Sequence, residues 1–211
     1  MNLSRLKRPL PPPDLTSTAR SPLQEKFVPD AALSKWLFNH FIAPDGQLFR
    51  VEHKHLKFAQ IGCVWTNAPL KLKGNAIAAT AEMPSVQGNA WARARFSQQL
   101  REWFGVEPDF LLTFYAPECA KRDDASFCAL CRHELLHCGQ KRDREGALRF
   151  DKDGLPCFCI RGHDVEEFNA VVEDFGVSCC GERAIEFARL ARRSPLIAPA
   201  RIALACGRCL K

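Results

Sequence analysis

The sequence predicts an α+β fold in which a small β-sheet packs on one central helix. Short runs rich in apolar and β-branched residues are typical of strands, and they precede a helical segment at residues 123–138. A second, amphipathic helical pattern follows at residues 163–175, where a helix could face the first one. The length of 211 residues suits one domain with appendages and is enough to bury a core.

Three regions are expected along the chain. Residues 1–25 are basic and rich in proline, so we expect a disordered tail, and the prolines leave no apolar segment for a secretory signal. Residues 26–195 should form the domain, and residues 196–211 a C-terminal tail with a CxxC motif. Because no apolar run approaches the roughly 18 residues of a membrane helix, we expect no membrane contact. The odd number of cysteines and the lack of an export signal favour a cytoplasmic protein.

The domain should begin with a helix that Asp30 caps and that ends before Pro44. His53 and His55 alternate with charged residues ahead of the first strand, so we expect them on a solvated surface. The remaining elements are strands at residues 57–65, 75–82 and 109–115, a helix at 89–104, a hairpin at 147–160 and a helix at 182–193.

The segment at residues 123–138 has the features of a buried helix. Asp123 and Asp124 suit its N-terminus, and Gly139 is a natural residue just beyond its C-terminus. Its interior carries enough apolar side chains for a core position, namely Leu130, Leu135 and Leu136.

This helix carries the pattern His133-Glu134-Leu-Leu-His137. Residues four apart share one helix face, so both imidazoles can reach one zinc ion. Glu134 lies beside the first histidine, where it can take a proton from a water that zinc activates. The alternative is a core helix with two hydrogen-bonded histidines, but burying them beside a glutamate without a metal would be costly.

A catalytic zinc usually has a third protein ligand. His163 has the best setting, because it follows Gly162 and opens the second helical pattern, from which it could face the first helix across the metal. Carboxylates also serve as third ligands, so Asp164, Glu166 and Glu167 remain alternatives.

The two histidine motifs, with a hairpin-like spacer between them, resemble the Putative phage metallopeptidase family, over residues 58–176. That family belongs to the minimal zincins and is distantly similar to SprT-like proteases. The resemblance implies a zincin-like fold, His133, His137 and His163 as metal ligands, and Glu134 as the catalytic residue. It also implies a phage or prophage origin, and therefore the cytoplasm of the host cell.

The expected function is a zinc-dependent metallopeptidase that acts on protein or peptide substrates. Glu134 would serve as general base and then pass the proton to the leaving amine. Tyr115 or Arg161 could stabilise the oxyanion, and Asp164 or Glu166 could orient a ligand imidazole. The alternative is a catalytically silent zincin-like binding protein in which the zinc is structural.

Eleven cysteines are present, and an odd number without an export signal favours reduced thiols. Cys128, Cys131 and Cys138 fall near one stripe of the central helix, where free cysteine behaves as a small apolar residue. A second zinc site is conceivable at the pairs Cys206/Cys209 and Cys179/Cys180.

The net charge of +6 comes from basic residues that are scattered along the chain. A nucleic-acid-binding protein usually gathers them on one face with interleaved aromatic residues, so the sequence favours a peptide over a nucleic acid as partner. Oligomeric state is not encoded in any recognisable pattern.

Overall fold

The computed structural model describes residues 6–72, 74–165, 172–174, 176–202 and 205–206. The chain divides into two compact units. The main unit comprises Asn2–Arg161 and Ala200–Lys211, and the second unit comprises Gly162–Pro199 together with Met1.

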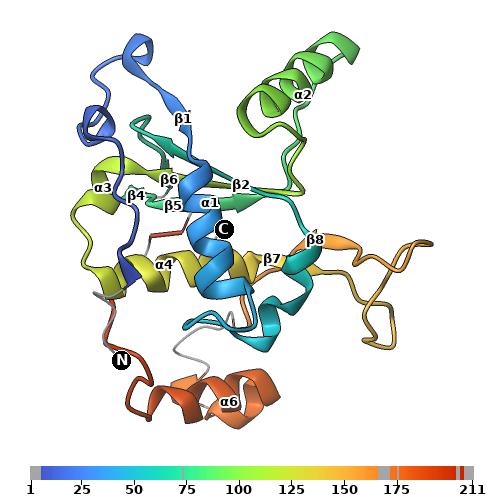
Figure 1. The fold of residues 1–211 in the computed structure, drawn as a ribbon. Coiled ribbons are helices and arrows are strands. Elements are labelled where there is room, and N and C mark those ends of the chain that lie inside the picture. Colours follow the sequence, from blue (N-terminus) through green and yellow to red (C-terminus); the bar gives the residue numbers. More distant parts are fainter. Residues whose placement is uncertain (1–5, 73, 166–171, 175, 203–204, 207–211) are drawn as a thin grey trace. The chain divides into compact units, whose positions relative to one another are not determined.

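A four-stranded sheet forms the centre of the main unit (Figure 1). Its strands lie in the order β1 (Phe27–Pro29), β2 (Ile61–Thr66), β6 (Phe110–Tyr115) and β5 (Ala79–Glu82). The central pair β2 and β6 is parallel, whereas both outer pairs are antiparallel, and β5 forms an edge. Two further strand pairs are antiparallel: β3 (Lys71–Leu72) with β4 (Asn75–Ala76), and β7 (Cys138–Gln140) with β8 (Phe158–Ile160).

Capping side chains fix where the helices begin. The carboxylate of Asp30 accepts from Leu33 N at the start of α1 (Ala31–Leu37), and Asp123 accepts from Ser126 N at the start of α4 (Asp124–His137). The other helices are α2 (Ala90–Phe104) and the short α3 (Ala116–Ala120). A π-helical turn at Phe38–Ile42 extends α1, and 3₁₀ turns lie at Pro13–Leu15, Pro22–Gln24 and Val51–Phe58.

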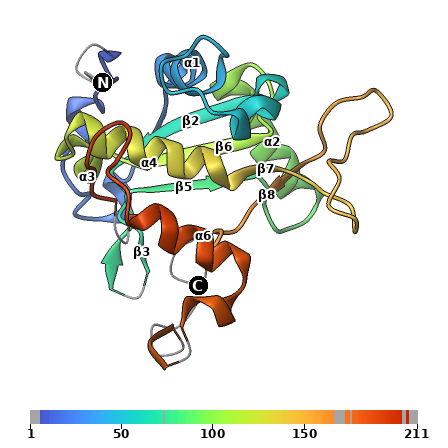
Figure 2. The same cartoon turned by 90° about the horizontal axis from the view of Figure 1, so that it is seen from below.

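Helices cover both faces of the sheet. Successive strand residues point to opposite sides, and both sides carry apolar side chains that pack against helices. On one face, Phe127 of α4 packs on Trp65 and Phe114, with ring centroids 6.1 and 5.9 Å apart. On the other face, Phe104 of α2 lies over Gly62, where a β-carbon would come within 2.9 Å of its ring. Figure 2 shows α4 running alongside β5 and β6.

The expected α+β class with a small sheet and several helices is confirmed. The first long strand begins only at Ile61, because the residues ahead of it form the 3₁₀ turn Val51–Phe58. In that turn His53 and Leu56 are both buried, as expected for side chains three residues apart, which align in a 3₁₀ helix. The expected strand at 75–82 is divided into β4 and β5.

The expectation that His53 and His55 lie on a solvated surface is wrong. His53 is fully buried, and its Nδ1 lies 3.1 Å from the carbonyl oxygen of Phe41. His55 is partly buried, and its Nε2 lies 2.8 Å from the carbonyl oxygen of Cys138, just beyond α4. Burial lowers the pKa of His53 to about 4, so its ring is neutral near pH 7.

The segment expected to be a disordered tail contacts the domain over much of its described part. Leu6 and Leu15 are buried, and the carbonyl oxygen of Leu6 accepts a hydrogen bond from Trp36 Nε1 at 2.8 Å. Arg8 pairs with Asp124 in the first turn of α4, with Nε and Oδ1 2.7 Å apart. These contacts connect the N-terminal segment to α1 and α4.

The second unit contains a 3₁₀ turn at Val177–Cys180 and the helix α6 (Glu182–Ala191), close to the helix expected at 182–193. Most of the helix expected at 163–175 falls on residues 166–171 and 175, which lie outside the described residues. Within the parts of the chain that are described, none of the helices combines the length and hydropathy of a membrane span.

Candidate metal centre

The last turn of α4 brings the two histidines of the motif together. The Nε2 atoms of His133 and His137 lie 3.3 Å apart, and the ring centroids are 5.0 Å apart. The i, i+4 spacing places both rings on one helix face, as the sequence predicts. His137 is only 2% exposed, whereas His133 is partly exposed.

Backbone contacts beyond the helix orient His137. Its Nδ1 donates to the carbonyl oxygen of Arg161 at 2.8 Å, and the amide nitrogen of Arg161 donates to the carbonyl oxygen of His137 at 2.8 Å. With a proton on Nδ1, the lone pair of Nε2 is available to a metal ion. The backbone of Arg161 therefore orients the ring of His137. The sequence suggested an acidic side chain, Asp164 or Glu166, for orienting a ligand imidazole.

Gly139 explains how Arg161 reaches this position. The sequence suggests Gly139 as a helix terminator, but it lies inside β7, opposite Cys159 of β8. A β-carbon on Gly139 would come within 3.0 Å of the β-carbon of Arg161. The glycine thus allows β7 and β8 to approach closely. Arg161, which directly follows β8, therefore lies next to His137.

Glu134 is the buried acid of the centre. Its side chain is 0% exposed, although it follows His133 on the same turn of α4. Its Oε2 lies 3.8 Å from Sγ of Cys206. A carboxylate held beside two imidazoles in a dry environment is suited to accept a proton from a water molecule.

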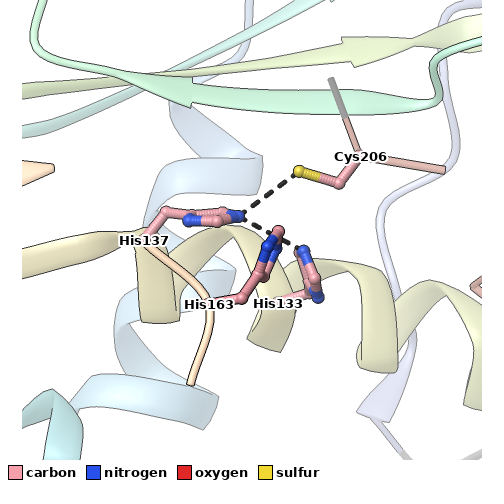
Figure 3. A group of neighbouring side chains, drawn as sticks. All are labelled: His133, His137, His163 and Cys206. Atoms are coloured by element: carbon pink, nitrogen blue, oxygen red, sulfur yellow. Dashed lines mark hydrogen bonds between the residues drawn. The ribbon is translucent and has the colours of Figure 1, made fainter. Parts of the chain in front are cut away.

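Cys206 is a residue of the centre that sequence reasoning did not place there. Its Sγ lies 3.3 Å from Nε2 of His137, and the side chain is 1% exposed. One ligand atom each of His133, His137 and Cys206 lies within 4.8 Å of the others (Figure 3). The sequence suggested Cys206 only for a second, separate zinc site, and nothing in the sequence connected it to α4.

These atoms fit a metal ion such as zinc. Zn–N bonds of about 2.0–2.1 Å at a tetrahedral angle separate two nitrogens by about 3.4 Å, and a nitrogen from a sulfur by about 3.6 Å. The observed separations are 3.3 Å between the two Nε2 atoms and 3.3 Å between Nε2 of His137 and Sγ. Imidazole and thiolate are also the ligand types that zinc prefers.

The other predicted site residues lie in different settings. Tyr115 lies on the same face of β6 as Leu111 and Thr113, the face that α2 covers, and its hydroxyl lies 2.8 Å from Thr18 Oγ1. A role in stabilising an oxyanion at α4 does not fit this arrangement. His163 and Asp164 belong to the second unit, and Glu166 lies outside the described residues.

The four cysteines suggested for a second zinc site do not all belong to one unit of the described structure. Cys179 and Cys180 belong to the second unit, where their sulfur atoms are 3.5 Å apart, and Cys209 lies outside the described residues. Cys206 instead contacts His137. Cys128 and Cys131 are buried free thiols, as expected for an apolar stripe, and burial raises the pKa of Cys128 to about 11.

The geometry defines a protein with a candidate metal centre on an HExxH helix. A family model identifies it further: the chain belongs to the Putative phage metallopeptidase family, whose model matches residues 34–193. This confirms the resemblance seen in the two histidine motifs and extends it to α1 and α6. No curated protein and no solved structure matches the chain.

Proposed function

We propose that this protein is a zinc-dependent metallopeptidase. The observation that carries the proposal is the convergence of His133 Nε2 and His137 Nε2, 3.3 Å apart, beside the buried Glu134. Membership of a metallopeptidase family supports the same reaction class. Zinc held here would polarise a scissile carbonyl and make a water molecule a stronger nucleophile near neutral pH.

His163 is proposed as the third ligand, beside His133 and His137. Arg161 is held at His137 by two backbone hydrogen bonds, and His163 is only two residues further along the chain. Consecutive Cα atoms are about 3.8 Å apart, so this short connection keeps His163 within reach of the centre.

Glu134 is proposed as the general base and then the general acid. Its buried carboxylate would take a proton from the attacking water and pass it to the leaving amine. The guanidinium of Arg161 is the remaining candidate for stabilising the oxyanion, since its side chain is exposed beside His137. Asp164 or Glu166, which follow His163 directly, are proposed to orient its ring.

The proposed substrate is an unfolded protein or an extended peptide in the cytoplasm of the host cell. The edge strand β5 lies on the side of the sheet next to α4 and can pair with an extended chain. A peptide bound along this edge would pass close to the two histidines.

A catalytically silent protein with a structural zinc is the second candidate. The position of Cys206 favours it, because four protein ligands are typical of structural zinc sites, whereas catalytic sites keep one position open. The two candidates differ in what Glu134 does, since a structural site needs no base.

Metal content and activity of matched variants test the proposal. We expect about one zinc per chain in the reduced wild-type protein, and much less in His163→Ala and His137→Ala. Glu134→Gln should retain the zinc and lose activity on a denatured protein substrate by about 10²-fold or more. A wild-type protein that holds one zinc per chain but cleaves no substrate would support the structural role instead.

A further inference from the structure

We propose that the C-terminal segment at Ala205 and Cys206 is a built-in inhibitor of this centre. The sulfur of Cys206 would take the metal position that an attacking water needs, and Ala205 would take part of the strand edge that a peptide needs. This inference rests on the proposed function, because it concerns access to the same metal.

The first observation is the place of the sulfur. Sγ of Cys206 lies 3.3 Å from Nε2 of His137 and 3.8 Å from Oε2 of Glu134. A water molecule positioned for attack would have to lie between the metal and this same carboxylate. The sulfur therefore lies close both to a ligand nitrogen and to the base, where an attacking water molecule would be needed.

The second observation is the backbone of the same segment. The carbonyl oxygen of Ala205 accepts hydrogen bonds from the amide nitrogens of Ala78 and Ala79, at 2.7 and 3.2 Å. Cys206 forms a parallel bridge with Ala79, the first residue of β5. The segment thus pairs with the outer edge strand of the sheet in the way that a bound peptide would.

The segment is held by its two small buried side chains, Ala205 and Cys206, and by polar contacts upstream of them. Upstream, Arg201 N donates to Ser126 Oγ at 3.0 Å, and Arg122 Nη1 donates to the carbonyl oxygen of Arg201 at 2.7 Å. Both contacts are hydrogen bonds, and Arg201 itself is exposed. Release would expose only the small side chains of Ala205 and Cys206, and the hydrogen bonds upstream could exchange for hydrogen bonds to water.

Release requires a simple ligand exchange. With a metal bound, the sulfur of Cys206 would leave it and take up a proton from solvent, and water would take the place of the sulfur. No oxidation is involved, and no covalent bond within the chain changes. A substrate that competes for the β5 edge would favour release, because it displaces Ala205.

Cobalt spectroscopy tests whether Cys206 binds the metal. The reduced full-length protein loaded with Co²⁺ should show a thiolate-to-cobalt charge-transfer band in the near ultraviolet. The band should persist in Cys138→Ser and disappear in Cys206→Ser, which should still bind cobalt. Cys138 is a matched control, because it is buried next to His137 but its sulfur lies 3.5 Å from the carbonyl oxygen of Glu134.

Peptidase assays test whether that bond restrains the enzyme. Cys206→Ala should cleave a denatured, fluorescently labelled protein faster than wild type by about tenfold or more, since the competent state is a minor population in the wild type. Cys138→Ser should cleave it at the wild-type rate. Circular dichroism of each variant would confirm that the fold is retained.

Each contrary outcome has its own meaning. A cobalt-loaded wild type without the charge-transfer band overturns the inference and leaves the proposed function standing. A band without any gain of activity in Cys206→Ala overturns the inhibitory role and makes Cys206 a structural ligand. A wild type that binds neither cobalt nor zinc overturns the proposed function and the inference together.

Discussion

The two ends of α4 are built from different kinds of contact. Near the N-terminus, Phe127 packs among Trp65, Phe114 and Trp36, with centroid distances of 6.1, 5.9 and 6.0 Å. Near the C-terminus, Glu134 and His137 are equally buried but are surrounded by other polar groups. One end contributes stability by apolar burial, whereas the other holds groups that are costly to bury and that are suited to a metal.

The cysteines show the same contrast. Cys131 lies in the middle of α4 among other thiols, where burial raises its pKa well above the ordinary value, so it stays protonated and inert. Cys206 is buried to a similar extent but faces an imidazole nitrogen at 3.3 Å. Burial alone therefore does not decide what a cysteine does; the neighbouring donor atoms do.

The largest effect is expected where aromatic packing holds the helix. Phe127→Ala should lower the free energy of unfolding by about 3–5 kcal/mol, because it removes a ring that three aromatic side chains surround. Urea titration measures the loss. Phe187→Ala, at an exposed position on α6, should change it by less than about 0.5 kcal/mol. Equal losses in both variants would contradict the assignment of stability to this end of α4.

A smaller effect is expected from the burial of His53, in the 3₁₀ turn that contacts α4. His53 has a folded pKa of about 4, below that of an unfolded histidine, so the unfolded state binds more protons between these values. The metal-free protein should therefore lose up to about 3 kcal/mol of stability as the pH falls from about 6.5 to about 4.

His53→Leu isolates this contribution. Chemical denaturation of the metal-free variant at several pH values should show a flatter dependence than the wild type over the same window. His40→Leu, at a partly exposed position, should leave most of the dependence intact. An unchanged slope in His53→Leu would show that other groups cause the acid sensitivity.

The smallest effect is expected at the first turn of α4. Asp123→Ala removes the carboxylate that accepts from Ser126 N at 2.7 Å, which should cost about 1 kcal/mol of unfolding free energy. Asp123→Asn keeps an accepting oxygen and should restore most of the loss. Zinc affinity should stay unchanged in both variants, because the cap lies at the opposite end of the helix from the histidines. A weakened zinc site would show that the two ends are coupled.

The sequence by itself determined the parts of the centre that lie on one helix. The caps of α4, its apolar interior and the four-residue spacing of His133 and His137 are local properties, so they could be predicted from pattern alone. The three longest strands and the helices α1, α2 and α6 were anticipated for the same reason, with shifted boundaries at β2 and β5.

Only the tertiary structure decided which distant groups meet α4. Cys206 is 69 positions from His137 in the sequence, and Arg161 is 24 positions away and acts through its backbone, which no sequence pattern reveals. Strand register turned Tyr115 to the far face, and packing buried His53 in a segment that reads as polar. Side-chain spacing along one element follows from helix geometry, whereas contacts between elements depend on how the whole chain packs.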